Sequence, residues 1–410
     1  MKMLFVLYDY LPSGSAEANL LSKLIVSMKK YGFSVDVLTT KSNLSQKDIE
    51  EHDRTRIFRV VSSRAISIRK SLKQSGFIRI AAMTFEKIYD IIIEKYPKNF
   101  LIKSVINNFY LGFQNFNLND YDVIIPVCAY YETYTATKKY VKKHNIKSCI
   151  VVYQIDPLSG NSSYSDKSYK NRLQMEVDMS KTASAIITTD IIKNEKKALK
   201  IDSDKVFSLE FPSVTDMTNN SSSFSRNAEI KCVFSGYIHK KIRDPEYTFR
   251  LFSKFSSPKI ILYIIGAGSE EILSKYKATY PERFIQVGIV SLDKSFEYIK
   301  NADILVNIGN NVTNFVPSKI FDYISTGKPI INFYKNKDCP TLEYFKKYDN
   351  AISVHEDIEH IDDYTECVES FINERVGKKL SYEQIEKDFR QCTADYVAHE
   401  FYKIIMNELQ

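Results

Sequence analysis

The sequence feature that most constrains the fold is an arrangement of strand, glycine-bearing turn, helix and strand that occurs twice in the 410 residues. The first copy predicts a strand at residues 2–8, a helix at 18–31 and a strand at 34–39. Three later apolar runs predict strands at residues 123–126, 148–153 and 185–188. Strands that alternate with helices in this way are typical of a parallel sheet in an α/β domain.

The pattern begins again after residues 212–227, a polar segment rich in Ser and Asn. The second copy predicts a strand at 231–235, a helix at 246–255 and a strand at 259–265. A chain of this length is too long for one ordinary core. We therefore predict an α/β protein with two Rossmann-like, doubly wound domains at residues 1–211 and 229–381, a linker at 212–228 and a helical C-terminal segment at 382–410.

The motif with the most chemical content is the segment 311–332, NVTNFVPSKIFDYISTGKPIIN. It predicts a loop, a short helix that begins at Pro317 and Ser318, a stop at Gly327 and a buried strand. A helix N-terminus offers unpaired N–H groups and a partial positive charge, which suit a phosphate. Asp322 lies one turn further on the same face as Ser318, where a carboxylate can accept hydrogen bonds from sugar hydroxyls. These residues predict a site for a nucleotide-sugar.

This motif, PSKIFDY followed by STGKPI, resembles the donor-site signature of GT-B glycosyltransferases. Within that fold it is most similar to the retaining, family-4-like enzymes of bacterial surface-polysaccharide synthesis. The resemblance implies two Rossmann-like domains that face each other, with the active site in the cleft and a C-terminal helix that crosses back to the N-terminal domain. It also implies retention at the anomeric carbon, a nucleoside-diphosphate donor such as a UDP-sugar, and neither metal nor cofactor. The alternative interpretation is an ordinary loop–helix–strand unit.

The donor diphosphate needs fixed positive charge, because its two negative charges must be held and its developing charge stabilised on departure. A basic residue that follows the turn at Gly236 supplies this charge in the resembling enzymes. Arg243 is the first choice and Lys241 the second; a solvated basic loop is the alternative. Backbone at glycine turns and the loop that contains Ile289 would line the nucleotide. The expected donor-binding residues are Gly14, Ser15, Gly236, Lys241, Arg243, Gly266, Ile289, Pro317, Ser318, Lys319 and Asp322.

The expected catalytic residues are Asn314, Arg243 and Asp156. The resembling enzymes commonly carry two glutamates eight positions apart, and the matching residues here are Asn314 and Asp322. Asn314 keeps hydrogen-bonding ability beside the donor sugar but lacks the negative charge of a carboxylate. Asp156 follows a predicted strand, at the edge where ligands bind in α/β folds, and is expected to contact either sugar or acceptor. A cap or turn role before Pro157 is the alternative for Asp156.

A basic segment indicates the setting in which the protein works. Residues 64–110 contain nine Lys or Arg and three acids, interleaved with apolar residues. This pattern predicts attachment to an anionic membrane surface, where a lipid-linked saccharide acceptor would be found. A solvated helical face is the alternative, and no nucleic-acid motif is present in the sequence.

The N-terminal apolar run has no cleavage site, and the six cysteines lack disulfide or zinc spacing. We therefore expect a cytoplasmic protein, peripheral at the inner face of the membrane. Two other functions stay open at this point. One is a catalytically inactive GT-B subunit that binds a nucleotide-sugar, and the other is a nucleotide-sugar epimerase.

Overall fold

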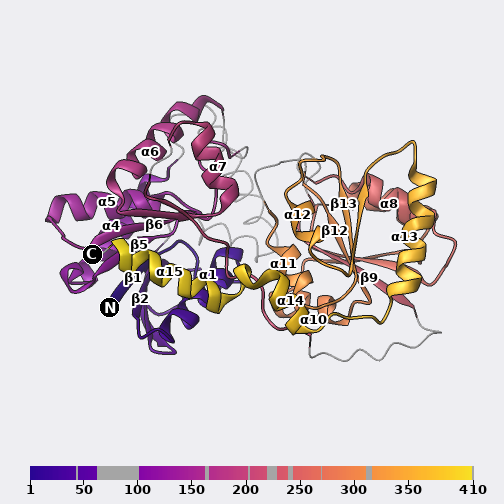
Figure 1. Ribbon diagram of the computed structural model, residues 1–410, viewed down its shortest axis with the longest axis horizontal. Helices are drawn as coiled ribbons and strands as arrows, with labels where there is room; N and C mark the ends of the chain where they lie inside the picture. Colours follow the sequence, from indigo (N-terminus) through magenta and orange to yellow (C-terminus); the bar gives the residue numbers. More distant parts are fainter. Residues whose placement is uncertain are drawn as a thin grey trace. The chain divides into compact units, whose positions relative to one another are not determined.

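The computed structural model forms two compact units, each built on a β-sheet with helices on both faces (Figure 1). The first unit comprises Met1–Pro212 and Ala394–Gln410, and the second unit comprises Ser213–Thr393. The structure describes residues 1–42, 45–61, 101–161, 166–201, 204–218, 229–238, 243–268, 270–310 and 316–408. This architecture confirms the predicted α/β fold class.

The sheet of the first unit has the strand order β3-β4-β2-β1-β5-β6-β7-β8. Its strands are β1 (Lys2–Val6), β2 (Ser34–Thr40), β3 (Ile49–His52), β4 (Thr55–Val60), β5 (Val123–Pro126), β6 (Cys149–Tyr153), β7 (Ala185–Thr188) and β8 (Val206–Ser208). All neighbouring pairs are parallel except β3 and β4. The carboxyl ends of β1 and β6 therefore lie at the same edge of the sheet, as ligand binding in this class of fold requires.

Helices bury both faces of this first sheet. Their bounds are α1 (Ala16–Lys29), α4 (Lys103–Gly112), α5 (Glu132–His144), α6 (Tyr169–Thr182), α7 (Asp190–Ala198) and α15 (Ala394–Glu408), with single 3₁₀ turns at Phe113–Asn115, Leu118–Asp120 and Asp166–Ser168. Alternate residues of β1 separate the two cores, because Met3 and Phe5 pack with α1 and α15 while Leu4 and Val6 pack with α4 and α5.

The sheet of the second unit is parallel throughout, in the order β11-β10-β9-β12-β13-β14. Its strands are β9 (Ile230–Ser235), β10 (Ile260–Ile265), β11 (Phe284–Gly288), β12 (Ile304–Ile308), β13 (Ile330–Tyr334) and β14 (Ala351–His355). Its helices are α8 (Glu246–Ser253), α9 (Glu270–Thr279), α10 (Leu292–Asn301), α11 (Lys319–Ile324), α12 (Thr341–Lys346), α13 (Ile361–Arg375) and α14 (Tyr382–Phe389), with a 3₁₀ turn at Arg390–Cys392. One face packs with α8 and α13, and the other packs with α10, α11 and α14.

The C-terminal segment differs from the prediction of one helical stretch at 382–410 that returns to the first domain. The chain breaks at the Arg390–Cys392 turn, and only α15 belongs to the first unit. Helix α14 stays with the second unit, where Ile385 and Phe389 are buried in its core. Helix α15 is held against α1 by Asp395, which accepts hydrogen bonds from Ser27 and Lys30. The crossing element is therefore shorter than the sequence predicted.

The predicted linker at 212–228 is described only up to residue 218, and this part packs on the second unit. Val214 forms a β-bridge with Thr393, and the Thr215 amide donates to the Ser325 hydroxyl at 3.1 Å. Residues 64–100 of the predicted membrane segment lie outside the described residues. Within the described ranges, no helix combines the length and the apolar character that a membrane crossing requires.

Candidate functional site

The glycine turn of the second unit at Gly266 brings the ends of two neighbouring strands into close contact. The Gly236 amide donates to the Ile265 carbonyl at 2.9 Å, and the Gly266 amide donates to the Gly288 carbonyl at 2.8 Å. Gly266 has φ +123°, and a Cβ atom on it would lie 2.0 Å from the Gly236 carbonyl oxygen. Only glycine fits such a position. The predicted residues Gly236 and Gly266 thus lie together, with bare backbone at the carboxyl edge of the sheet.

The next glycine in the same turn repeats this packing. Gly268 has φ +96°, and a Cβ atom on it would lie 1.7 Å from the Ile238 carbonyl oxygen. The Ile238 amide donates in turn to the Ala267 carbonyl at 2.8 Å. The GxG motif therefore has a structural cause here, which is the close approach of the β9 and β10 turns. Ile289, expected in the loop around the base, follows Gly288, and its side chain is exposed at 81%.

Arg243 lies beside this glycine edge and is held by neutral groups. Its Nε and Nη2 donate to the Asn310 side-chain oxygen at 3.1 and 2.9 Å, and its Nη1 donates to the Tyr237 carbonyl at 3.3 Å. The guanidinium lies 5.9 Å from the centre of the Phe234 ring, and burial lowers its pKa. Among the described residues, no carboxylate pairs with Arg243. A partly buried cation without a counter-ion favours an anion from outside.

The motif at 317–322 forms the start of α11, as the sequence predicted. Pro317 is buried, and Ser318 is exposed at the position just before the helix. The Lys319 ammonium lies 3.2 Å from an Asp322 carboxylate oxygen and 4.9 Å from the centre of the Phe296 ring. Asp322 is 8% exposed, so its carboxylate is largely buried and is paired with its neighbour one turn back. Lys319 and Asp322 therefore form an ion pair at the start of α11.

Tyr323 joins α11 to the end of β9, a contact that the sequence analysis missed. Its hydroxyl accepts a hydrogen bond from the Ser235 amide at 2.8 Å and donates to the Ser235 carbonyl at 3.3 Å. The Ser235 and Ser295 hydroxyls are 2.8 Å apart, which adds α10 to the same junction. Tyr323 is 1% exposed, and burial raises its pKa, so the phenol is neutral. These hydrogen bonds hold α11 at the end of β9, next to the Gly236 turn.

Two predicted residues of the second unit are not described by the structure, and one residue was missed. Lys241 and Asn314 lie outside the described residues. Asn310, which orients Arg243, was missed although it lies two residues after β12 at the carboxyl edge, and that position was the signal that could have found it.

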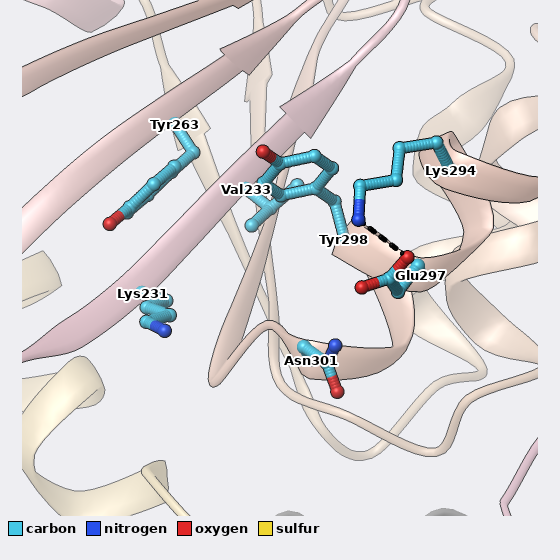
Figure 2. Close-up of a pocket in the computed structure, with 7 residues that line it drawn as sticks. All are labelled: Lys231, Val233, Tyr263, Lys294, Glu297, Tyr298 and Asn301. Atoms are coloured by element: carbon cyan, nitrogen blue, oxygen red, sulfur yellow. Dashed lines mark hydrogen bonds and ion pairs between the residues drawn. The ribbon is translucent and has the colours of Figure 1, made fainter. Parts of the chain in front are cut away.

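A separate cavity of about 210 Å³ lies between the sheet of the second unit and α10 (Figure 2). Its lining residues come from β9, β10 and α10: Lys231, Val233, Tyr263, Lys294, Glu297, Tyr298 and Asn301. The Tyr263 and Tyr298 ring centres are 6.3 Å apart, and Lys294 pairs with Glu297 at 2.8 Å. No residue of the predicted site lines this cavity.

The first unit has a different carboxyl edge, which is acidic. Glu17 on α1 is 5% exposed, and its carboxylate accepts from the Tyr8 and Asp9 amides at 3.3 and 3.1 Å. Burial raises the pKa of Glu17 well above its ordinary value, more than the two amide hydrogen bonds lower it. Gly14 and Ser15 precede this helix, where the Ser15 side chain accepts from the Ala18 amide at 3.2 Å. The Ser15 hydroxyl therefore caps α1.

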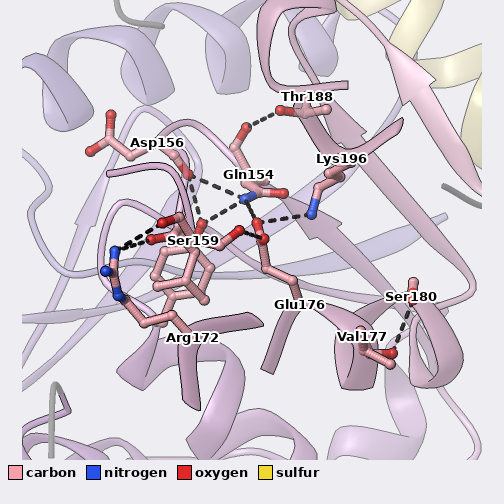
Figure 3. Close-up of polar contacts among 11 residues, drawn as sticks. Gln154, Asp156, Ser159, Arg172, Glu176, Val177, Ser180, Thr188 and Lys196 are labelled. Carbon is pink, nitrogen blue, oxygen red and sulfur yellow. Dashed lines mark hydrogen bonds and ion pairs between the residues drawn. The ribbon is translucent and has the colours of Figure 1, made fainter. Parts of the chain in front are cut away.

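Asp156 follows β6 at the same edge, where the sequence analysis expected it. Its amide donates to the Cys128 carbonyl at 3.2 Å, and its carbonyl accepts from the Tyr131 hydroxyl at 2.6 Å. Its carboxyl group points away from these contacts (Figure 3), and burial raises its pKa to about 6. Within the described part of the chain its carboxyl accepts no hydrogen bond. Asp156 therefore presents a carboxyl group that titrates near neutral pH.

Over the residues that the structure describes, no group of three or more His, Cys, Asp or Glu side chains is arranged to hold a metal ion. All six cysteines are free, and Cys367 is the exposed one among them.

The comparisons with known proteins agree with this fold. No protein-family model matches the sequence, and no curated protein matches it. Among solved structures, the apo form of the lipopolysaccharide outer core galactosyltransferase WaaB aligns over 100% of both chains, with a TM-score of 0.59 and 14% identity. Sucrose-phosphate synthase from Thermosynechococcus elongatus aligns over 99% of both chains, with a TM-score of 0.66 and 12% identity. A variant of TarM from S. aureus, in complex with UDP and other ligands, aligns over 100% of both chains, with a TM-score of 0.62 and 10% identity.

At these identities the similarity shows the fold, which is the GT-B fold that the sequence motif predicted.

Proposed function

We propose that this protein is a glycosyltransferase that moves a sugar from a nucleoside-diphosphate-sugar to a hydroxyl of a lipid-linked saccharide. The proposal rests on the environment of Arg243, which is a partly buried cation without a carboxylate partner among the described residues. It lies beside the close-packed turns of Gly236 and Gly266, where backbone can approach a ligand. A diphosphate supplies the two negative charges that this edge lacks.

The donor is assigned mainly to the second unit, part by part, and the predicted donor-binding residues Gly14 and Ser15 of the first unit remain part of the proposal. Arg243 and Lys319, with Lys241, would bind the diphosphate, and Asp322 would accept hydrogen bonds from the ribose. The backbone at Gly266 and the loop at Ile289 would line the base. A UDP-sugar is the donor class we favour, because the TarM structure was solved with UDP.

The chemistry needs a group that stabilises the departing diphosphate and a group that holds the donor sugar. The bond from the anomeric carbon to the diphosphate oxygen breaks, and a bond from that carbon to the acceptor oxygen forms. The acceptor proton moves to the departing diphosphate. Arg243 and Lys319 would stabilise the negative charge of that group, which is the electrostatic role usually found to be largest. Asn314 would hold the donor sugar, and Asp156 would orient the sugar or the acceptor hydroxyl. Retention and independence from metal are part of this proposal.

The acceptor is assigned to the first unit and to a membrane surface. Lysines on α5 support this assignment. Lys139, Lys142 and Lys143 are exposed, and the ammonium groups of Lys139 and Lys143 lie 5.3 and 5.7 Å from the centre of the Tyr110 ring. Anionic lipid attracts such a surface with about 1 kcal/mol per basic residue. A cytoplasmic protein that attaches reversibly to the inner membrane face would meet a lipid-linked saccharide there.

The test combines donor binding with transfer. Purified protein is mixed with UDP-sugars and with lipid-linked acceptors extracted from membranes, and products are identified by mass spectrometry. We expect a glycosylated acceptor and free UDP. The proposed glycosyltransferase activity is contradicted if the donor binds and no transfer or hydrolysis follows, because a non-catalytic subunit then explains the site. It is also contradicted if the donor sugar is converted without any acceptor, which indicates an epimerase.

A matched pair of variants localises the activity. Arg243→Ala removes the proposed diphosphate contact, and Lys294→Ala removes a lysine from the separate cavity of the same unit. Loss of UDP-dependent thermal stabilisation in the first variant alone is the expected result. Loss in the second alone would move the donor to the cavity of Figure 2.

A further inference from the structure

Residues 154–161, the segment that follows β6, are hydrogen-bonded to buried polar side chains of α6 and α7 (Figure 3). Glu176 on α6 and Lys196 on α7 form an ion pair at 3.1 Å, with side chains 3% and 2% exposed. The Glu176 carboxylate also accepts from the Gln154 side-chain amide at 3.1 Å and from the Ser159 hydroxyl. Two positions of the segment are therefore hydrogen-bonded to one buried carboxylate.

The network reaches Asp156 through its main chain. The Gln154 side-chain amide donates to the Tyr131 hydroxyl at 2.6 Å and to the Asp156 carbonyl at 3.3 Å. The Tyr131 hydroxyl donates to the same Asp156 carbonyl at 2.6 Å. Figure 3 shows the Asp156 carboxyl directed away from the buried groups, while its carbonyl is directed towards them. The network thus fixes the backbone of Asp156 and leaves its acid group unoccupied.

Arg172, one turn before Glu176 on α6, holds the far end of the same segment. Its Nη1 donates to the carbonyls of Leu158, Ser159 and Asn161 at 2.8, 3.1 and 3.0 Å. Residues four apart lie on the same face of a helix, so α6 presents both charged groups to the segment. The segment from 154 to 161 is thereby attached to one helix at both ends.

Stability alone gives a weak reason for this arrangement. A buried ion pair contributes little net stability, because the desolvation of two charges offsets their attraction, and apolar residues of similar size often serve as well. Its geometric effect is specific, because the Glu176 carboxylate accepts from both Gln154 and Ser159 while its charge is paired with Lys196. We infer that Glu176 and Lys196 are positioning residues that hold the carboxyl group of Asp156 in place for glycosyl transfer. This inference rests on the proposed function.

Other ionisable groups also face Asp156 and must stay unchanged in a test. Glu17 of α1 and Tyr131 interact electrostatically with it, and Asp9 lies next to Glu17. The variants below leave all three in place. Any change in the behaviour of Asp156 then comes from the network on α6 and α7.

The experiment is a double-mutant cycle between the ion pair and Asp156. The variant Glu176→Gln/Lys196→Met removes both charges and keeps a hydrogen-bond acceptor for Gln154, so that no unpaired charge is buried. We expect kcat/KM for the acceptor to fall about tenfold or more in the wild-type background, and less than about twofold when Asp156→Asn is already present. KM for the donor should not change. Equal losses in the two backgrounds would overturn the inference.

A matched control replaces another ion pair of α6. Lys138 and Asp178 pair at the surface, with side chains 32% and 36% exposed. Lys138→Met/Asp178→Asn should leave kcat/KM for the acceptor within about twofold of wild type. A loss as large as that of the buried pair would show that α6 acts only through stability, and would overturn the inference.

A second readout needs no activity. Carbon-13 NMR of the full-length protein follows the titration of the Asp156 carboxyl, whose pKa is raised to about 6 by burial. In the folded Glu176→Gln/Lys196→Met variant we expect this pKa to fall by roughly one unit, because a loosened segment admits water. An unchanged pKa in a folded variant would overturn the positioning role. If the wild-type protein transfers no sugar, the proposed function fails and this titration still decides the positioning.

Discussion

The carboxyl edges of the two sheets present different side chains around their central strands, although both sheets are largely parallel and belong to α/β units. The edge of the second unit presents glycine backbone and Arg243, which lacks a carboxylate partner among the described residues. The edge of the first unit presents Glu17 and Asp156, both with raised pKa values. We propose that the first arrangement binds an anionic ligand and that the second binds hydroxyl groups. The fold supplies two similar edges, and in this proposal their side chains determine which ligand each one binds.

The largest expected effect tests the backbone of the second edge. Gly266→Ala places a Cβ atom 2.0 Å from the Gly236 carbonyl oxygen, so the β9 and β10 turns must separate. We expect a loss of about 3 kcal/mol or more in the free energy of unfolding, measured by chemical denaturation, and loss of donor binding.

Gly288→Ala is the matched control for this prediction. Gly288 also has a positive φ of +79°, but an added Cβ atom would have nothing within 4 Å. The loss should therefore be about 1 kcal/mol from backbone strain alone. Equal losses in the two variants would show that the close approach at Gly266 does not matter.

The second effect tests the charge of the same edge. Arg243→Ala should weaken UDP binding by about 10- to 100-fold in isothermal titration calorimetry, because hydrogen bonds to charged groups contribute about 1.5–3 kcal/mol. Arg243→Lys should recover only part of this affinity, since a lysine cannot bond Asn310 and a phosphate in the same fork geometry. If Arg243→Ala binds UDP as wild type does, the contrast between the two edges has no functional meaning.

The third effect tests the acidic edge through pH. The folded protein raises the pKa of Asp156 from 3.8 to about 6, so the folded state keeps its proton where the unfolded state has lost it. The free energy of unfolding should therefore fall as pH rises from about 4 to about 6, by on the order of 1–3 kcal/mol for this group. Asp156→Asn should remove this part of the decline and be more stable than wild type at pH 7. Parallel stability profiles for the two proteins would contradict the raised pKa.

The smallest effect tests the junction between β9 and α11. Tyr323→Phe leaves the buried Ser235 amide without the phenol oxygen that it bonds at 2.8 Å. We expect a loss of about 1–2 kcal/mol in stability and a donor affinity reduced by a few-fold. Thermal unfolding measured with and without UDP separates the loss of stability from the loss of donor affinity. A stable variant with full affinity would show that α11 is positioned by its apolar contacts alone.

Much of the carboxyl edge of the second unit could be predicted from the sequence, because the residues that form each part of it are neighbours in the sequence. The glycine turns, the PSKIFDY motif and the short strands can each be recognised from a few neighbouring residues. The strands predicted at 231–235 and 259–265 agree with β9 and β10 to within one residue at each end. The break at Arg390–Cys392 left no mark, since apolar periodicity continues on both sides and no Gly or Pro interrupts it.

The carboxyl edge of the first unit was harder to predict, because it depends on contacts between residues that are far apart in the sequence. Glu176 and Lys196 lie on helices with many charged residues, so in sequence they look like solvent-facing positions. Only the packing of α6 against β6 and α7 buries them together. Glu17 was missed for the same reason, since its burial depends on the amides that follow β1.

The most direct test of the central claim is a crystal structure of the full chain with a bound UDP-sugar. The account predicts the diphosphate within hydrogen-bonding distance of Arg243 and Lys319, and the ribose hydroxyls at Asp322. Electron density for the nucleotide away from Arg243 and Asp322, for example in the cavity between β9, β10 and α10, would contradict it.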